Sequence, residues 1–570
     1  MAAAHVLDYV LYAFLMALGV AQGLYVSCRK RRGHDVSREA FLGDRSLGVL
    51  PLAVSVLVST ASPLGLVALT AHFYAYGLHL AWNVLITVSA VPLVVYCVVP
   101  VFYRLGVTSI FEYIRMRYNA FISLTTCAIY LILTQSVGAA LIFSAALTSS
   151  TIFGIPVITA SIMFGLIGTY YAAIAGLRGV VWTDCLQALI TLLAPLVVIG
   201  KVVYDSTVGT LPLRPLDDIE VDKYILDVSM DLTKEENVWS CLVGGVASFL
   251  YRLGFDQMVL QRYLASRNLS AAQRTAIVGV CFSGLYYLVL MAGAGALIYR
   301  FRDCDPMLSK SISALDQILP FYVKKELAPV LGFSGIFLAG VVTSSTSAVS
   351  SIINSQAAVL YVDVVAQYFP VRETWVSRTT KALAFASGII MTAYSLAVPY
   401  IGSTMRGAGA AACLTIAFQV WHMIGRMYSG ILPPRMPVTL DYCPDNTTDF
   451  DVIDYSTNTT DSPGSEEVFM LYRLSSFWSS FFSVIVTIAV GVVISLLTGG
   501  RKTAAMHEHL VDNTIRTAWR KTTRRQGSQS NEQTPSAPES TERTPCIPED
   551  ASKLVIDREE LERLTKETQV

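Results

Sequence analysis

The sequence predicts an all-α polytopic membrane protein, and its composition and two long uncharged runs carry this prediction. Hydrophobic residues make up 53% of the 570 residues and charged residues only 15%, against about 25% charged in soluble proteins. The runs 46–103 and 118–177 contain no Asp, Glu, Lys or Arg. A helix needs about 20 apolar residues to cross the hydrocarbon core, so each run holds two crossings. Neither run alternates as the strands of a membrane barrel do, which leaves helices as the spanning structure.

The charges and motifs exclude several other classes of function. The 42 basic and 42 acidic residues cancel, so no net field attracts a nucleic acid. The chain has no glycine-rich nucleotide-binding motif, no cysteine spacing typical of a metal site, and no catalytic triad among its 7 histidines. We therefore expect neither an enzyme nor an ATP-driven pump, and no organic cofactor.

Apolar spans follow one another along most of the chain. The first is kept as a membrane anchor because it is long and lacks the small-residue cleavage site of a signal peptide. The span that begins at residue 328 exceeds one crossing, so it is expected to tilt or to continue into the cytoplasm. The predicted spans are 6–27, 48–72, 79–102, 121–148, 153–175, 183–204, 238–257, 275–299, 328–361, 382–403, 407–430 and 474–498.

Basic loop residues orient these spans, because cytoplasmic loops are enriched in Lys and Arg. The basic segment 28–32 places the first loop inside, and the segment that carries Arg262 is likewise assigned to a cytoplasmic loop. After the eighth loop the alternation fails, since it would put the N-glycosylation sequons at Asn446 and Asn458 in the cytoplasm. Either one crossing is missing or one assigned span does not cross.

The second span contains a predicted break. It reads Ser55-Val-Leu-Val-Ser-Thr-Ala-Ser-Pro-Leu-Gly65, in which Pro63 removes a helical hydrogen bond and Gly65 loosens the backbone. Broken helices of secondary transporters offer freed carbonyl oxygens to a cation near the middle of the membrane. A kinked helix that serves only packing is the alternative.

Several stretches resemble the sodium/solute symporter family. They are Gly176–Gln187, Thr108–Asn119 and Ser347–Asp363. The stretch Arg302–Pro306 and the sequence Leu-Leu-Thr-Gly-Gly-Arg-Lys at 496–502 are similar to the branch of sodium-coupled monocarboxylate and multivitamin transporters. The resemblance implies an inverted five-plus-five helix repeat of the LeuT type with flanking helices. The tenth core helix has no counterpart in the sequence, which would explain the failed alternation.

The same resemblance implies the organisation and the function of the chain. It implies sodium-coupled symport of a small organic solute, such as a monocarboxylate or a vitamin-like anion, across the plasma membrane by alternating access. A sodium-binding sensor or transport-deficient homologue on the same fold and a passive channel are the alternatives. The expected parts are a flanking transmembrane helix at 1–27, the transporter core at 46–403, a flanking helix at 404–430, a glycosylated extracellular loop at 431–473, a last transmembrane helix at 474–498 and a disordered cytoplasmic tail at 499–570.

A sodium site is implied between the break and the span 328–361. Its expected ligands are the carbonyl oxygens of Val58, Ala61 and Ser344 and the hydroxyl of Ser347. Asp184 matches a position that assists a second sodium in some relatives, or it caps the start of its helix. Ala348 stands where the family usually has a second hydroxyl, which should weaken the site. Packing alone is the alternative role of these serines.

The substrate is expected beside the break, where the matching positions are Leu64, Gly65 and Val67. Arg252, four residues before Asp256, is a candidate to receive a carboxylate. The alternative is an i,i+4 ion pair whose arginine reaches toward the membrane interface.

The loops and the tail carry three further predictions. Cys304 and Cys443 fall in predicted extracellular loops, where a disulfide can form. The terminal residues Thr568 and Val570 match a class of PDZ-binding termini, which add as a strand to a scaffold domain. The expected partners are therefore the lipid bilayer, sodium, a small solute and a PDZ scaffold, without nucleic acid.

Overall fold

The computed structural model describes parts of the first of two compact units of the chain, 1–512 and 513–570. The predictions for Ala61, Cys443, Asn446, Asn458, Thr568 and Val570 lie outside the described residues, as do 402–420 and the tail from 498. The described residues are 2–28, 36–60, 64–208, 220–234, 236–327, 330, 332–369, 371–401, 421–423, 425–426, 435–439 and 469–497.

Helices make up almost all of the regular structure in these ranges, where one isolated bridge between Leu47 and Ser266 is the only extended pairing. Six helical spans of the described chain are long and apolar enough to cross a membrane, and a bent pair adds a seventh. The predicted polytopic all-α class is therefore confirmed. The six are His79–Leu105, Ala120–Phe153, Val157–Ile174, Gly176–Val208, Leu269–Phe301 and Phe333–Tyr368.

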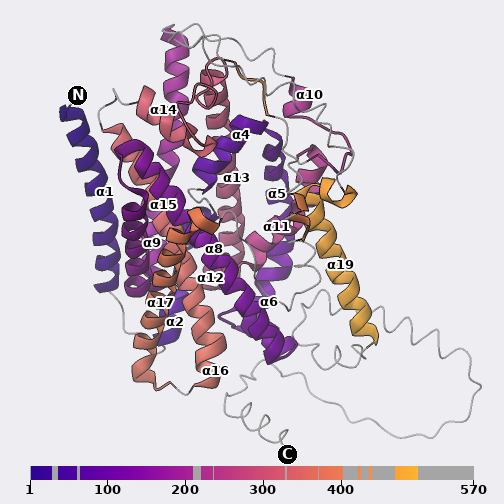
Figure 1. Ribbon diagram of the computed structural model, residues 1–570. Helices are drawn as coiled ribbons and strands as arrows, with labels where there is room; N and C mark the ends of the chain where they lie inside the picture. Colours follow the sequence, from indigo (N-terminus) through magenta and orange to yellow (C-terminus); the bar gives the residue numbers. More distant parts are fainter. Residues whose placement is uncertain are drawn as a thin grey trace, which may run out of the picture. The chain divides into compact units, whose positions relative to one another are not determined.

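One helix lies at the centre of the bundle and is buried along nearly its whole length. It is α15 (Phe333–Val359), whose small Ser, Thr, Ala and Gly side chains let its neighbours approach closely (Figure 1). Its neighbours are α1 (Ala2–Cys28), α3 (Val49–Thr60), α8 (Ala120–Phe153), α9 (Val157–Val208) and α17 (Glu373–Ile401).

The remaining helical elements surround this centre or lie at its ends. They are α2 (Val36–Leu42), η2 (Leu64–Leu69), α4 (Thr70–Tyr76), α5 (Asn83–Leu93), η4 (Val94–Val98), α6 (Val99–Leu105), α7 (Ile110–Arg117), α10 (Val221–Tyr224), η6 (Ser240–Gly244), α11 (Val246–Leu250), η7 (Tyr251–Phe255), α12 (Gln257–Leu264), α13 (Leu269–Phe301), α14 (Ile318–Glu326), η9 (Leu360–Val365), α16 (Ala366–Tyr368) and α19 (Ser476–Leu497).

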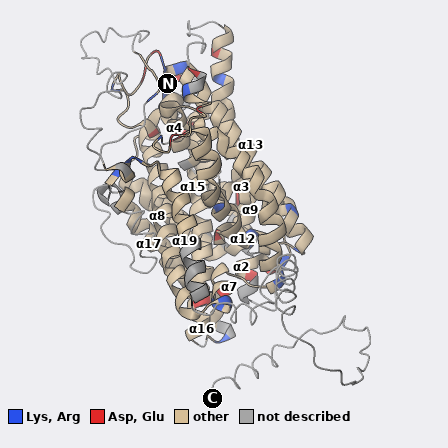
Figure 2. Ribbon diagram, turned by 90° about the vertical axis from the view of Figure 1, so that its right-hand side faces the viewer, with Lys and Arg blue, Asp and Glu red and all other residues tan. Residues whose placement is uncertain are grey.

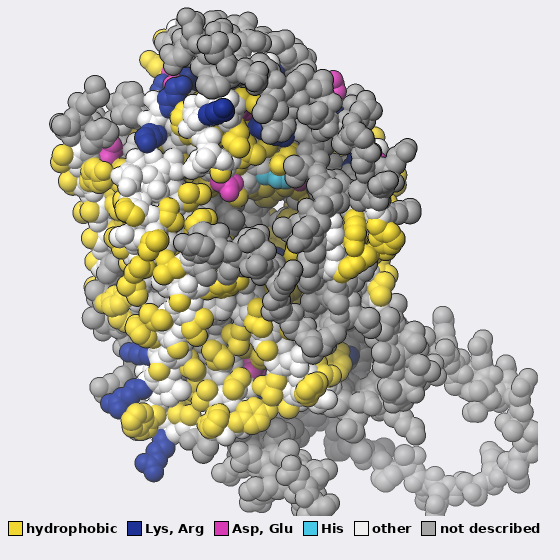
Figure 3. Space-filling model, viewed as in Figure 1, with side chains coloured by type: hydrophobic (Ala, Val, Ile, Leu, Met, Phe, Trp, Pro, Cys, Tyr) yellow, Lys and Arg dark blue, Asp and Glu magenta, His cyan; other side chains and the backbone are white. Residues whose placement is uncertain are grey.

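The outer surface of the bundle is apolar where lipid would contact it. Hydrophobic side chains cover the middle of the face in Figure 3, with Lys and Arg near its upper and lower margins. Figure 2 shows that most of the helix length carries no charge and that many of the charged residues lie near the helix ends. Apolar side chains can face lipid at little cost, and the backbone polar groups behind them are hydrogen-bonded inside each helix.

The predicted break in the second span is confirmed. The helix α3 and the segment Gly65–Tyr76 meet at an angle of 60°. The segment after the break begins with η2, a π-helical turn, before α4 continues toward the end of the span. Pro63 lies between the two halves, in the short stretch 61–63 outside the described residues.

A second sharp turn divides α9 at Gly176, inside the motif that resembles the symporter family. Gly176 has φ 61° and ψ −172°, a backbone conformation that is almost exclusive to glycine. A Cβ atom there would also lie 3.2 Å from the Ala40 carbonyl oxygen. The turn separates the spans Val157–Ile174 and Gly176–Val208, so the second begins at Gly176 and not at the predicted residue 183.

Two other helices begin earlier in the chain than the sequence predicts, and both for the same reason. The helix α17 begins at Glu373 where 382 was predicted, and α13 begins at Leu269 where 275 was predicted. Both extra turns carry charged residues, which extend a helix beyond the hydrocarbon core and escape a hydropathy window. The span predicted at 238–257 was wrong in a more important way, because helical structure resumes in α12 and continues to Leu264.

Candidate functional site

The first half of the broken span ends with its polar side chains turned onto its own backbone. The Ser59 hydroxyl donates to the Ser55 carbonyl at 2.7 Å, and the Thr60 hydroxyl donates to the Leu57 carbonyl at 2.8 Å. Val58, in the same turn of the helix, is also buried. These carbonyl groups belong to the last turns of α3, directly before the break.

Space is available directly after the break. A Cβ atom built on Gly65 would meet no other atom within 4 Å, whereas Val67 is buried two residues later. Leu64 lies in the π-helical turn η2, and its side chain is outside the described part. π-helical turns occur frequently at functional sites because they leave backbone groups imperfectly paired.

Opposite α3, the central helix α15 presents Ser347 in a direction that its neighbours do not share. The Ser347 hydroxyl donates to Asp184 Oδ1, while Ser345 donates to the Leu141 carbonyl of α8 and Thr346 to the Val342 carbonyl of its own helix. Ser344 and Ala348 are also buried. The Ser345 and Thr346 hydroxyls therefore point away from Asp184, so neither replaces the oxygen that is absent at Ala348.

Asp184 of α9 joins the two helices. Its carboxylate accepts hydrogen bonds from the Ser55 hydroxyl of α3 at Oδ2 and from the Ser347 hydroxyl of α15 at Oδ1. The side chain is fully buried. The expectation that Asp184 caps its helix was wrong, because this half of α9 begins at Gly176 and Asp184 lies more than two turns inside it.

The positive partner of Asp184 is Arg262, which the sequence had placed in a cytoplasmic loop. Arg262 lies in α12 with its side chain fully buried, and its Nη2 is 3.3 Å from Asp184 Oδ2. The guanidinium also donates to the Ser55 hydroxyl at 2.6 Å, the Ser351 hydroxyl at 2.7 Å and the Met258 carbonyl at 2.6 Å. Nothing in the local sequence distinguishes this arginine from Arg267, which is exposed. Only the fold identifies it.

A second interrupted helix faces the first. After η7 the backbone of Asp256 is extended, with φ −68° and ψ 120°, and its carboxylate accepts the Met258 amide at 2.9 Å as the N-cap of α12. The predicted i,i+4 ion pair between Arg252 and Asp256 is confirmed. Arg252 also donates to the Ser59 carbonyl at 2.7 Å and so connects the two interruptions. Asp256 two residues after Gly254 was a readable signal for this break.

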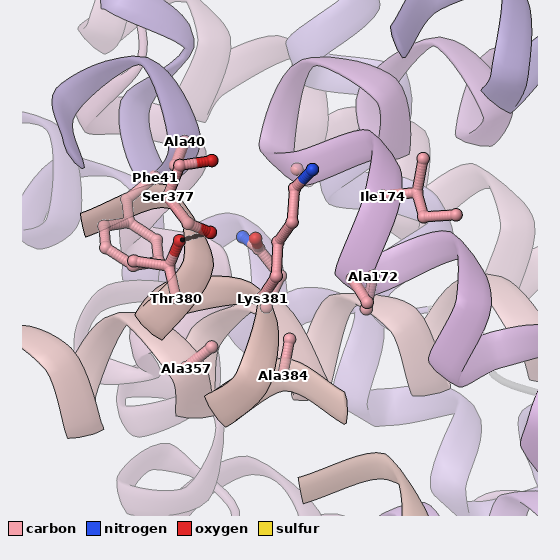
Figure 4. Close-up of a pocket in the computed structure, with 12 residues that line it drawn as sticks. Ala40, Phe41, Ala172, Ile174, Ala357, Ser377, Thr380, Lys381 and Ala384 are labelled. Atoms are coloured by element: carbon pink, nitrogen blue, oxygen red, sulfur yellow. Dashed lines mark hydrogen bonds between the residues drawn. The ribbon is translucent and has the colours of Figure 1, made fainter. Parts of the chain in front are cut away.

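A small cavity of about 30 Å³ lies at the end of the bundle that carries the Gly176 turn. Asn354 of α15 lines it and donates to Gln261, the residue before Arg262, at 3.4 Å. Figure 4 shows the Lys381 side chain extending from α17 into the space between α2 and α9. Asn354 therefore links the lining of this cavity to the helix that carries Arg262.

The opposite end is fixed by Asp305, which belongs to the predicted extracellular loop. Its carboxylate accepts the Tyr74 hydroxyl at 3.1 Å and the Met307 amide at 2.6 Å, and it pairs with Arg435 at 3.3 Å. Cys304 beside it is disulfide-bonded. Because Cys443 lies outside the described residues, the pairing of these two cysteines stays a prediction.

Comparison with known proteins agrees with this architecture. The family model named Sodium:solute symporter family matches residues 40–422. The sodium-coupled monocarboxylate transporter 1 of Homo sapiens is 26% identical, over 87% of this chain and 88% of its own length. The sodium-dependent multivitamin transporter of Oryctolagus cuniculus is 27% identical over 87% and 83%, and the sodium/iodide cotransporter of Homo sapiens 30% identical over 63% and 55%.

A solved structure shows the same fold. It is described as the substrate-bound outward-open state of a Na+-coupled sialic acid symporter, and it superposes with a TM-score of 0.63 at 18% identity, over 74% of this chain and 85% of that one. The likeness confirms the LeuT-type arrangement of helices. Since the family model also covers more than half of the sequence, this multi-pass membrane protein belongs to the sodium:solute symporter family.

Proposed function

We propose that the protein couples the downhill movement of sodium to the uptake of a small organic anion across the plasma membrane. The observation that carries this proposal is the 60° break after Thr60 in a span whose Ser55 is joined through Asp184 to Ser347 on the central helix. A monocarboxylate or a vitamin-like anion is the favoured substrate class, because relatives named for monocarboxylate and multivitamin transport cover most of the chain.

The proposed sodium ligands are oxygens of the two facing helices. Ser347 donates its proton to Asp184, so the lone pairs of its hydroxyl oxygen are available to a cation. The remaining ligands are backbone carbonyls, which carry no formal charge and suit a site that must release its ion in every cycle. The set is Val58, Ala61, Ser344 and Ser347.

The proposed substrate position is the space beside Gly65, next to Leu64 and Val67. Arg252 is 36% exposed and bonds to the Ser59 carbonyl near the end of the first half of the span. A guanidinium has five N–H donors, so Arg252 retains donors for a carboxylate after binding Asp256 and Ser59. The cavity beside Asn354 is the proposed route for release at the opposite end.

Uptake in cells tests the proposal. Cells that express the protein should accumulate [14C]lactate or [3H]biotin in sodium medium and lose that uptake when N-methyl-D-glucamine replaces sodium. Ser347→Ala should raise the sodium concentration for half-maximal uptake by about five-fold to a hundred-fold, which corresponds to about 1–3 kcal/mol for a lost buried polar partner. The matched control is Ser350→Ala, because Ser350 bonds only within α15.

The same experiment separates the alternatives. Uptake that ignores sodium replacement would contradict symport and favour a passive pathway. Sodium binding without uptake of any anion would favour a sensor, a function that the missing hydroxyl at Ala348 supports. Two peripheral proposals have independent tests: glycosidase treatment should shift the mass through Asn446 and Asn458, and PDZ capture should require Thr568 and Val570.

A further inference from the structure

The buried cation beside Asp184 has a consequence for how many sodium ions the protein binds. Arg262 makes four hydrogen bonds, to Ser55, Met258, Asp184 and Ser351, which belong to α3, α12, α9 and α15. Arginine stays protonated in proteins. The guanidinium is therefore a permanent positive charge built into the junction of four helices.

The charges around the break cancel before any ion binds. Arg252 pairs with Asp256 and Arg262 with Asp184, so two cations face two anions. A sodium ion held by carbonyl and hydroxyl oxygens at the break adds one positive charge. A second sodium at Asp184 would add another next to a fully buried guanidinium, where like charges repel strongly because little solvent screens them.

The oxygens around Asp184 are also already in use. Both carboxylate oxygens accept hydrogen bonds, and Ser55, Ser351 and the Met258 carbonyl accept the guanidinium donors. Without Arg262, these groups and Ser347 would form a set of hard oxygen atoms around one negative charge. Such a set suits an alkali cation.

We propose that Arg262 occupies the place of a second sodium at Asp184 and so limits the protein to one sodium ion per chain. This inference rests on the proposed function for the first sodium. Asp184 then acts as a positioning residue, since it orients the Ser347 hydroxyl toward the ion without binding sodium itself.

Direct binding of ²²Na⁺ to the purified full-length protein in nanodiscs tests the inference. The wild type should bind one sodium ion per chain at saturation. Arg262→Gln removes the internal cation and should bind two, while Arg262→Lys keeps the charge and should bind one. The double variant Asp184→Asn with Arg262→Gln removes both charges and should also bind one. Arg300→Gln is the matched control, because Arg300, in the last turn of α13, forms a separate ion pair with Glu326 of α14.

The outcomes separate this inference from the proposed function. Two ions in the wild type, or equal counts in the wild type and a folded Arg262→Gln variant, would overturn the inference. A wild type without saturable sodium binding would reject the proposed function, but a gain of one ion in Arg262→Gln would still support the role of Arg262. If size-exclusion chromatography shows that Arg262→Gln does not fold, the wild-type count decides: one ion supports the inference and two overturn it.

Discussion

Two arginine–aspartate pairs stand beside the break, and they are held in opposite ways. Arg252 and Asp256 are four residues apart at the interruption before α12, and the arginine is 36% exposed. Arg262 and Asp184 come from different helices and are both 0% exposed. The first pair follows from local chain geometry. The second exists only because the fold brings α9 and α12 together.

The difference in burial indicates which of the two pairs the fold depends on for its stability. A buried charge that loses its partner has no water to replace it, whereas an exposed arginine recovers its hydration. We therefore expect the Arg262–Asp184 pair to control stability and ion number, and the Arg252–Asp256 pair to be available for substrate contact.

The largest expected effect comes from breaking the buried pair on one side. Asp184→Ala leaves the Arg262 guanidinium without a counter-charge and should lower the free energy of unfolding by about 3–5 kcal/mol. The measurement is thermal unfolding in nanodiscs with intrinsic fluorescence. The double variant Asp184→Ala with Arg262→Met is the control, and it should recover part of the loss. A double variant no more stable than Asp184→Ala would show that lost packing, not the unpaired charge, dominates.

An intermediate effect should come from the Arg252–Asp256 pair, in which the arginine is partly exposed and the aspartate is buried, and it should arise from the helix cap. Asp256→Ala removes the acceptor of the Met258 amide and should cost about 1 kcal/mol. Asp256→Asn keeps a capping oxygen and should cost only about a few tenths of that value, although it removes the ion pair. Thermal unfolding of the two variants distinguishes these roles. Equal losses would mean that the charge of Asp256 contributes more than its cap.

The contrast between the two pairs also shows what the sequence can predict. The break at Pro63 and Gly65 and the Arg252–Asp256 pair were both readable, because each depends on residues within a few positions of one another. The class and the family were readable for the same reason, since uncharged runs and short motifs are local signals.

The sequence could not predict the contacts between residues of different helices. Arg262 resembled a loop arginine because hydropathy ends the span at 257, and its partner lies in another helix. Asp184 was wrongly expected as a possible cap because the same window missed the first turns of its helix. The break at Asp256 was not predicted because no proline marks it, although an aspartate two residues after Gly254 is a capping signal.

The smallest expected effect restores the hydroxyl that Ala348 lacks, next to the serine that Asp184 orients. Ala348 is buried, and the hydroxyls around it already bond to other groups. A hydroxyl introduced by Ala348→Ser can donate to the Ser344 carbonyl one turn earlier, as Thr346 does to Val342, and its oxygen becomes a new ligand where it faces the ion. The variant should be less stable without sodium and should bind ²²Na⁺ about two-fold to ten-fold more tightly, which corresponds to about 0.5–1.5 kcal/mol for a new polar contact.

The matched control is Ala358→Ser, three turns further along the same buried helix, where sodium affinity should not change. A gain in affinity confined to Ala348→Ser would place the ion between the break and α15, while the number of ions stays at one because Arg262 still neutralises Asp184. No gain from Ala348→Ser, combined with a large loss from Ser347→Ala, would mean that the ion contacts Ser347 from the side that faces away from Ala348. In that case the missing hydroxyl would not weaken the site, and the sensor alternative would lose the observation that supports it.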